Sequence, residues 1–479
     1  MSSNNRAGPS GVNATLALII IGYTAIFTAA AWYKTDIQRQ GFDFGVHEQV
    51  IWNTSQGRFA ATSAFAGTES YLGIDIILVE LLLTPFYMLL PSMKTLLFLK
   101  TLALALGAIP VALLARKHLA WAWAGPAFAA AYLLYHPVEY MNLYEFQIRA
   151  FAVPCFLWAL WGLDERRGRI FWLGVIGALS CRSEFGLVLA ALGMANLTRA
   201  DLRQGRATLT FGIVPVVVGL GWTALCVGVL VPYFRDGAPF LYTRVIYGWL
   251  GENPTQIVGT LLTQPLWVLA QIATADRARY LLELLLPWAF LPLLRPRLLF
   301  AMLPVMALNL LSNSPNIHAS TRFHYQALII PLIIVATILV LAQLTRARPG
   351  AQRTVVIGLL ALALACNLGF GNPIMRLATH PVDTARNAAV LALLAQVPPD
   401  AALTATNTIG PLAARRTQLF YFPGNVIYPA AHVPRGEYLL LDDDELGDRG
   451  RVLLAQLAAS GAYTELARDA GVSLWRRAR

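Results

Sequence analysis

About twelve apolar runs, several of them short enough to be partial or tilted membrane spans, follow one another from residue 16 to residue 370. The first, Leu16–Tyr33, contains no charged residue and is long enough to cross a bilayer as a helix. The chain is 57% hydrophobic and only 13% charged, far from the average soluble domain. We therefore expect an all-α polytopic membrane protein with about 11–12 hydrophobic segments. The later runs are Ile76–Leu90, Thr95–Ala115, Trp121–Tyr135, Ala150–Leu163, Ile170–Ser180, Phe185–Ala195, Thr208–Val231, Leu281–Leu294, Leu298–Leu311, Ala327–Leu344 and Val355–Phe370.

Short connections rich in arginine and lysine separate several of these runs. Short basic connections favour the cytoplasmic side, so an N-terminus inside the cell is expected. Counting crossings then places the loops 34–75, 139–149, 182–184, 232–280 and 312–325 together on the outer face. The net charge of +11 would suggest nucleic acid in a soluble protein, but here the basic residues mostly punctuate apolar runs, and no nucleic-acid partner is expected. The basic connections are Arg116–Lys117, Arg166–Arg169, Arg199–Arg206, Arg295–Arg297 and Arg346–Arg353.

The segment between Asp75 and Arg116 conflicts with this count, because it holds two apolar runs where one net crossing is allowed. Either one run is re-entrant or interfacial, or the Arg116–Lys117 connection lies outside. The agreement of four other basic connections favours the first alternative.

The chain changes character near Asn372. A helical period runs through Val382–Leu394, and short β-type runs follow at Ala402–Thr406, Gln418–Phe422 and Tyr438–Leu441 before a helical run at Arg451–Ala458. We expect a membrane domain over residues 1–371, with outer loops 34–75 and 232–280. Residues 372–479 are expected to form a small soluble α/β domain on the outer side.

The acidic segment after the first apolar run, Gly41–Gln49, holds the two candidate catalytic acids. Phe42, Phe44 and Gly45 flank Asp43, a setting in which a carboxylate can be held partly apolar and act as a general base. Glu48 is the weaker candidate, for acceptor or metal binding. The alternative is that these acids are solvated loop residues or helix caps.

Three further polar segments supply candidate binding residues. Tyr144, Glu145 and Arg149 lie in an aromatic, amide-rich stretch typical of sugar-binding surfaces, although interfacial aromatic belts have the same composition and Glu145 could simply pair with Arg149. Arg182 and Glu184 interrupt two apolar runs, where a guanidinium either binds a lipid phosphate or meets headgroups.

Arg322 and His324, in the densest late polar segment, are the second choice for a phosphate contact, against a plain loop. His47, His318 or His324 with Asp75 could hold a divalent metal, but no spacing is a metal signature, and the cofactor and any metal ligands are left unassigned.

The order of several motifs resembles a family of bacterial predicted membrane proteins of uncharacterised function that is related to the GT-C glycosyltransferases. The resemblance covers nearly the whole chain. The motifs are Phe42–Gly45 with Gln49 and Trp52–Asn53, Leu82–Tyr87, Asn142–Phe146, Arg182–Leu187, Phe323–Tyr325 and Ala405–Asn407.

The resemblance implies a GT-C-like helical bundle, a catalytic acid in the first outer loop, which falls on Asp43, and a polyprenyl-phosphate sugar donor. The basic residue of the family's Lys-Glu-Asp segment falls on Arg182 and its final acid on Glu184. Asp75 stands where the family usually shows a His-Phe-Ser-Pro segment, and Gln147-Ile148-Arg149 stands for His-Pro-Glu. These departures weaken any metal role and indicate a different substrate or a lost activity.

The function expected from the sequence is membrane glycosyl transfer from a polyprenyl-phosphate lipid to a glycan, lipid or protein acceptor at the outer face of a bacterial cytoplasmic membrane. Asp43 would be the general base. The alternatives are a non-enzymatic transporter or flippase of lipid-linked glycans, and a membrane assembly scaffold.

Overall fold

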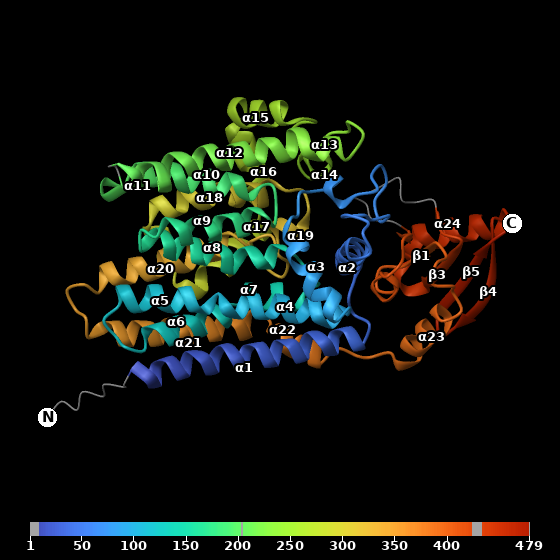
Figure 1. The fold of residues 1–479 in the computed structure, drawn as a ribbon, viewed down its shortest axis with the longest axis horizontal. Helices are drawn as coiled ribbons and strands as arrows, with labels where there is room; N and C mark the ends of the chain where they lie inside the picture. Colours follow the sequence, from blue (N-terminus) through green and yellow to red (C-terminus); the bar gives the residue numbers. More distant parts are fainter. Residues whose placement is uncertain (1–8, 203–204, 424–433, 479) are drawn as a thin grey trace.

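The computed structural model describes residues 9–202, 205–423 and 434–478. The apolar runs form helices that lie side by side along the molecule, with the C-terminal sheet at one end (Figure 1). Among the described residues, four helical stretches have the length and composition to cross a membrane: Ser10–Asp36, Met93–His118, Arg206–Tyr233 and Ala351–Ala378. They contain α1 (Pro9–Asp36), α4 and α5 (Met93–Leu106 and Ala108–His118), and α21 and α22 (Ala351–Gly369 and Pro373–Ala378). The stretch Arg206–Tyr233 contains α11 (Arg206–Thr208), α12 (Val214–Leu225) and α13 (Val231–Tyr233), which are joined by two π-helical turns.

Shorter helices fill the bundle between these four. Most residues of α20 (Ile329–Leu344) are buried, and this helix is apolar on all sides, as a helix surrounded by other helices must be. Helices α10 and α12 (Val214–Leu225) approach closely, because a Cβ atom on Gly186 would lie 2.3 Å from the Gly219 carbonyl oxygen. The other short helices are α6 (Ala124–Leu133), α8 (Arg149–Asp164), α9 (Gly168–Leu179), α10 (Phe185–Leu197) and α18 (Pro296–Leu311).

The two apolar runs between Asp75 and Arg116 have different fates. The first becomes α3 (Val79–Leu89), whose 11 residues span about 16 Å, well short of a bilayer core. The second becomes the 26-residue stretch Met93–His118. Of these two helices only the second has the length and composition to cross a membrane, which agrees with the interfacial alternative.

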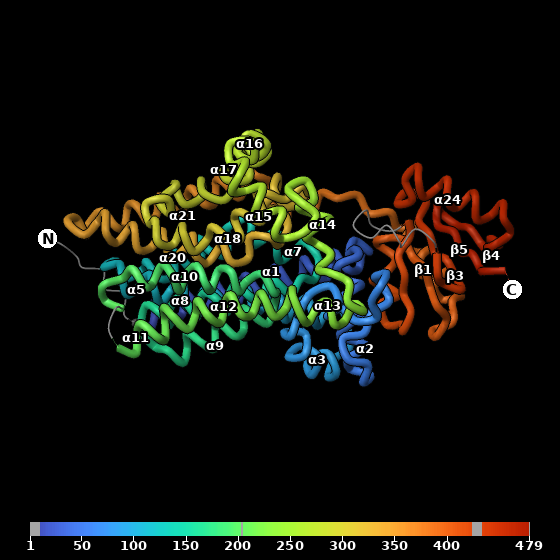
Figure 2. Tube along the Cα trace, turned by 90° about the horizontal axis from the view of Figure 1, so that it is seen from above, coloured from blue at the N-terminus to red at the C-terminus, as the bar shows by residue number. Residues whose placement is uncertain are grey.

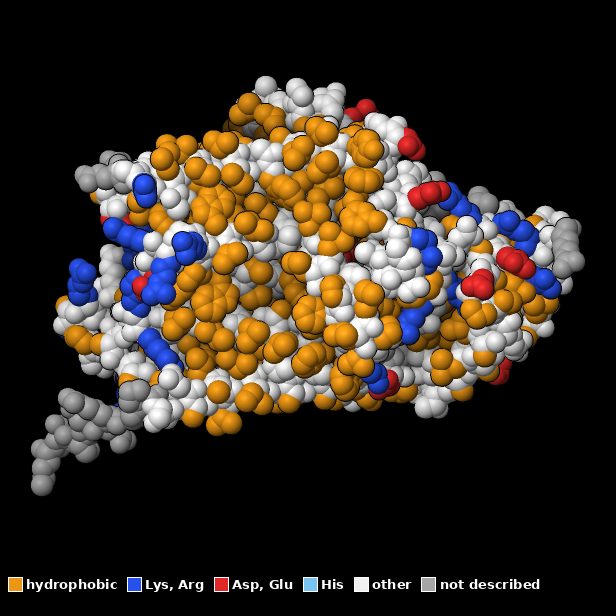
Figure 3. Space-filling view, in the orientation of Figure 1, with side chains coloured by type: hydrophobic (Ala, Val, Ile, Leu, Met, Phe, Trp, Pro, Cys, Tyr) orange, Lys and Arg blue, Asp and Glu red, His pale blue; other side chains and the backbone are white. Residues whose placement is uncertain are grey.

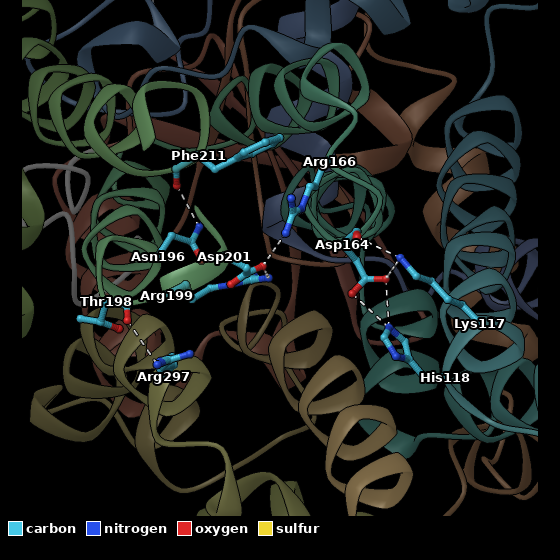
Figure 4. Close-up of polar contacts among 10 residues, drawn as sticks. All are labelled: Lys117, His118, Asp164, Arg166, Asn196, Thr198, Arg199, Asp201, Phe211 and Arg297. Atoms are coloured by element: carbon cyan, nitrogen blue, oxygen red, sulfur yellow. Dashed lines mark hydrogen bonds and ion pairs between the residues drawn. The ribbon is translucent and has the colours of Figure 1, made fainter. Parts of the chain in front are cut away.

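Basic connections gather at the end of the bundle near the N-terminus, here called the basic end. Figure 3 shows Lys and Arg side chains there, separated by a broad hydrophobic surface from the C-terminal domain. Figure 4 shows Lys117 and His118 directed at Asp164, and Arg166 and Arg199 directed at Asp201. The Arg116–Lys117 connection thus lies with the other basic connections.

The opposite end, called the cavity end, carries short helices that do not cross the bundle. The first outer loop forms α2 (Phe42–Ser55) and a 3-10 turn at Tyr71–Gly73, and α7 (His136–Leu143) precedes the aromatic stretch. Residues 232–280 fold mainly into α14 to α16 and the start of α17, of which α16 stands out from the bundle in Figure 2. These helices are α14 (Leu241–Tyr247), α15 (Pro254–Thr263), α16 (Pro265–Ile272), α17 (Ala275–Leu285) and, from the late polar segment, α19 (Pro315–His318).

The C-terminal domain is a five-stranded sheet in the order β2-β1-β3-β5-β4. β1 (Leu403–Ala405) pairs in parallel with β2 (Leu419–Tyr421) and β3 (Tyr438–Asp442), while β5 (Val472–Arg477) is antiparallel to β3 and to β4 (Tyr463–Asp469). Helices α23 (Thr384–Leu394) and α24 (Gly447–Ala459) complete the domain. The sequence predicted α23, α24 and the first three strands, and it missed the β4–β5 hairpin.

Candidate functional site

A cavity of about 730 Å³ lies at the cavity end of the bundle. Residues from all five loops that the sequence placed on one face line it, together with Asn407 of the C-terminal domain. One part of the wall is apolar, with side chains of α14 and α18. The polar lining includes Asp43, His47, Tyr144, Glu145, Gln147, Arg149, Arg182, Ser183, Glu184, Asn309, Asn313, Ser314, Asn316, His324 and Asn407.

Helix α2 aims Asp43 and His47 into the cavity, because residues four apart lie on one helical face. The Tyr144 hydroxyl donates a hydrogen bond to Asp43 Oδ2 at 3.4 Å. His47 Nδ1 lies 2.6 Å from Glu80 Oε1, so the Glu80 carboxylate fixes the imidazole ring.

Glu48 does not belong to this site. It is five residues beyond Asp43, on another face of α2, where its Oε1 accepts hydrogen bonds from Tyr87 at 3.0 Å and from Arg415 at 3.2 Å. The proposed role of Glu48 in acceptor or metal binding is therefore not supported by its position.

Four charged side chains form an alternating chain of ion pairs beside the cavity. Arg182 Nε lies 2.9 Å from Asp75 Oδ2 and 3.4 Å from Glu184 Oε2, and Arg149 Nη2 lies 2.7 Å from Glu184 Oε1. Both ion pairs of Arg182 use Nε, and Arg149 Nε has no hydrogen-bond partner among the described residues. Both arginines thus retain donors for an anion.

The pKa shifts follow from burial of these groups. Burial raises the pKa of Asp43, with the opposing positive charge of His47 and the Tyr144 hydrogen bond acting against it. Burial and the neighbouring Asp43 raise the pKa of Glu145 to about 7. Burial also opposes ionisation of Glu184, but Arg149 and Arg182 outweigh it and lower the pKa of Glu184. At neutral pH we therefore assign Glu184 as the ionised partner of the two arginines.

Two lysines, Lys34 of α1 and Lys100 of α4, hold the loop that contains Tyr144 and Glu145. Lys34 Nζ donates to the carbonyl oxygens of Leu143, at 3.0 Å, and Tyr144, while Lys100 Nζ donates to that of Glu145 at 2.6 Å. These carbonyls follow the end of α7, where cations are favourable. The lysines hold Tyr144 and Glu145 at the cavity.

The pairing of Glu145 with Arg149, one of the sequence alternatives, does not occur. Arg149 begins α8 and turns to Glu184, whereas Glu145 Oε2 accepts from the Phe44 backbone N–H at 3.1 Å. The reason is that residues 144–148 form a loop rather than a helical turn.

Arg322 is separated from the other phosphate candidates. Its guanidinium lies over the Tyr140 ring, 5.6 Å from the centroid, and it does not line the cavity. His324, two residues on, does line it and is buried, and burial lowers its pKa well below the ordinary value. Of Arg322 and His324, only His324 therefore lies at the site.

The described residues contain no group of three or more His, Cys, Asp or Glu side chains arranged to hold a metal ion. His47 is engaged by Glu80, and His318 Nδ1 lies 2.8 Å from the Ser312 carbonyl oxygen. No metal step is therefore assigned to these residues.

Several residues at the site were not among the predicted site residues, and they include His47, Asp75, Gln147 and Asn407. Asp75 was noted as a possible metal ligand and as a departure from the family pattern, His47 only as a metal candidate, Gln147 only as a departure from the family pattern, and Asn407 only as part of a motif. The spacing of His47 from Asp43 was the one signal that could have identified a site residue, because it equals one helical turn.

Residues 34–474 match the family described as "Predicted membrane protein (DUF2079)". The chain belongs to this family. No curated protein matches the chain in sequence.

The fold is similar to that of crystal structures of ArnT from Cupriavidus metallidurans. The apo state is 14% identical with a TM-score of 0.53, and the state bound to undecaprenyl phosphate is 13% identical with a TM-score of 0.51; each match covers 95% of this chain and 98% of that chain. A structure of the Archaeoglobus fulgidus oligosaccharyltransferase with Zn and sulfate is 14% identical over 94% of this chain and 73% of that one, with a TM-score of 0.44. The predicted fold class, a GT-C-like helical bundle with a small C-terminal α/β domain, is confirmed.

Proposed function

We propose that this protein is a membrane glycosyltransferase that moves a sugar from a polyprenyl-phosphate carrier to a hydroxyl-bearing acceptor. The observation that carries the proposal is that Asp43 and the Arg149–Arg182 pair line one cavity. A carboxylate base and an anion-binding group are the two elements that such a transfer needs. The ArnT structure with undecaprenyl phosphate supports the choice of carrier, since the two chains share a fold.

The reaction is a single displacement with inversion. Asp43 takes the proton of the acceptor hydroxyl, whose oxygen forms a bond to the anomeric carbon while the bond from that carbon to the phosphate oxygen breaks. The leaving polyprenyl phosphate keeps the bonding electron pair, and Arg149 and Arg182 stabilise its charge. No covalent enzyme intermediate is required.

The remaining groups have supporting roles in the proposal. Tyr144 and Gln147 hold Asp43, and Glu184 keeps both arginines oriented. The apolar wall contributed by α14 and α18 accepts the first prenyl units of the carrier. We place the cavity end and the C-terminal domain on the outer side of the cytoplasmic membrane, because the basic end carries the positive connections.

The test uses a strain that lacks the gene, complemented with the wild-type or the Asp43→Asn chain. Mass spectrometry of extracted lipids reports polyprenyl-phosphate sugars without requiring that the acceptor be known. The donor lipid should accumulate in the deletion and Asp43→Asn strains and fall to its normal level with the wild-type chain. Glu48→Gln is the matched control, because it changes an acid of the same helix that faces away from the cavity.

A normal donor level in the Asp43→Asn strain, with the protein present in the membrane, would show that Asp43 is not the general base. The transporter or scaffold hypothesis would then replace the transferase hypothesis, because neither function requires a general base.

A further inference from the structure

The helix that carries Asp43 has no capping side chain of its own. Its N-cap residue is Gly41, and no side chain of that position satisfies the first backbone N–H groups of α2. Serine, threonine, aspartate or asparagine usually stands there, because the first turn of a helix leaves its N–H groups without partners.

Two side chains from distant parts of the chain supply the missing acceptors. Asn407 Oδ1 accepts a hydrogen bond from the Phe42 N–H at 2.9 Å, across 365 residues of sequence. Glu145 Oε2 accepts from the Phe44 N–H at 3.1 Å, across 101 residues. A carboxylate at this end of a helix also has a favourable interaction with the helix dipole.

Gly41 is required by this arrangement. A Cβ atom built on it would lie 2.5 Å from Glu145 Oε1 and 3.1 Å from Asn407 Nδ2. Any local capping side chain would therefore displace the two distant ones.

The C-terminal domain also packs along the rest of the first two turns of α2. The Tyr421 ring contacts the Phe42 ring edge-on, with 4.6 Å between the ring centroids. The Tyr421 hydroxyl lies so close to Gly45 that a Cβ atom built on Gly45 would be 2.1 Å from it. Gln49 Nε2 donates to the Arg416 carbonyl oxygen at 3.1 Å. The docking of the domain and the capping of α2 thus form one contact.

We propose that Asn407 is a positioning residue for Asp43, through which the C-terminal domain completes the active site. Asp43 lies in the first turn of α2, between the two N–H groups that Asn407 and Glu145 satisfy. Loss of either acceptor lets this turn fray and moves the carboxylate relative to Arg149 and Arg182. The proposal rests on the proposed function for its catalytic consequence, but the capping itself does not.

The experiment measures amide hydrogen exchange over residues 41–46 in the purified full chain and donor-lipid accumulation in the complemented strain. Asn407→Ala should speed exchange there about fivefold, the effect of losing one helix cap. It should also leave the donor lipid at a level between the wild-type and Asp43→Asn strains. Gly41→Ala should have the same two effects, since its Cβ displaces Glu145 and Asn407.

Two variants separate positioning from general loss of structure. Asn407→Asp keeps the accepting oxygen, and the amide nitrogen that it removes donates no hydrogen bond to the described residues, so both readouts should return toward wild type. Asn253→Ala removes an equivalent asparagine cap, of the Gln256 N–H at 2.9 Å on the exposed helix α15, and should change neither readout.

Unchanged exchange in Asn407→Ala would overturn the capping role. Faster exchange with a normal donor level, while Asp43→Asn accumulates donor, would overturn the positioning role. A normal donor level in Asp43→Asn would instead count against the proposed function, and exchange alone would then decide whether Asn407 caps α2.

Discussion

Arg182 and Asp75 at the cavity end have side chains that are 10% and 0% exposed, whereas Arg166 and Asp201 at the basic end are 57% and 45% exposed. Both are arginine–aspartate pairs, at 2.9 Å and 3.2 Å. The exposed pair is screened by water, but the buried pair has lost its hydration and depends on its partner.

This difference indicates what each end is for. Exposed ion pairs like those at the basic end contribute little to the free energy of unfolding. Their positive charges are typical of residues that fix the orientation of a protein across the membrane. Buried charges in a membrane protein are costly and typically mark substrate paths. The four-membered ion-pair chain beside the cavity is therefore consistent with the anion-binding role that we propose for Arg149 and Arg182.

Of the variants that compare the two ends, Arg182→Met should have the largest effect on the unfolding temperature. It leaves the Asp75 carboxylate buried without its cation, which costs about 3–5 kcal/mol in folding free energy. The apparent unfolding temperature in detergent should fall sharply, and the double variant Arg182→Met with Asp75→Asn should recover most of it. If the unfolding temperature of Arg182→Met fell no further than that of a variant of the exposed Arg166–Asp201 pair, the buried and exposed pairs would not differ as proposed.

The second prediction concerns opposite signs of pH dependence at the two ends. Burial raises the pKa of Asp43 above 3.8, so the native carboxyl keeps a proton that the unfolded one has lost, and stability falls as pH rises through the raised pKa. Hydrogen bonding from Arg199 lowers the pKa of Asp201 to about 2, so its contribution is present above 3.8 and is lost as pH falls toward 2.

Unfolding temperatures measured at pH 7.5 should therefore rise slightly for Asp43→Asn and fall slightly for Asp201→Asn, with both changes smaller than that of Arg182→Met. Near pH 3.5 the gain of Asp43→Asn should disappear, since the native and unfolded carboxyls are then both largely protonated. Destabilisation by Asp43→Asn at pH 7.5 would mean that the acid is structural rather than held for chemistry.

The smallest expected effect is that of Arg166→Ala. Water screens its pair with Asp201, so the loss should stay below about 0.5 kcal/mol and the unfolding temperature should hardly move. Donor-lipid levels should be normal in this variant. A large loss of stability would show that the basic end is as tightly coupled as the cavity end.

The sequence predicted the membrane fold because hydropathy responds to the bilayer, and it predicted the shared face of the five loops because charge bias sets orientation. It also placed Asp43, Arg149 and Arg182 among the candidates, since polar residues that interrupt apolar runs are conspicuous. These signals depend on local composition alone.

Contacts between distant residues were beyond the sequence. Nothing near Gly41 indicates that Asn407 caps α2, and nothing near Arg149 indicates that Glu184 rather than Glu145 is its partner. The β4–β5 hairpin was missed because β4 is mostly exposed and lacks clear alternation, and because its Ala470-Gly471 turn, with positive φ at both residues, is not one of the dipeptides that mark such turns in a sequence. The position of Glu48, which is buried but faces away from the cavity, follows from helical geometry once the start of α2 is known.

The most direct test of the central claim is a density map of the full chain in lipid nanodiscs with added undecaprenyl phosphate, compared with a map without it. The account predicts new density for the phosphate within hydrogen-bonding distance of Arg149 and Arg182, with Asp43 facing the space beyond it. A headgroup bound at Arg322 or at the basic end, with the cavity unchanged, would contradict the account.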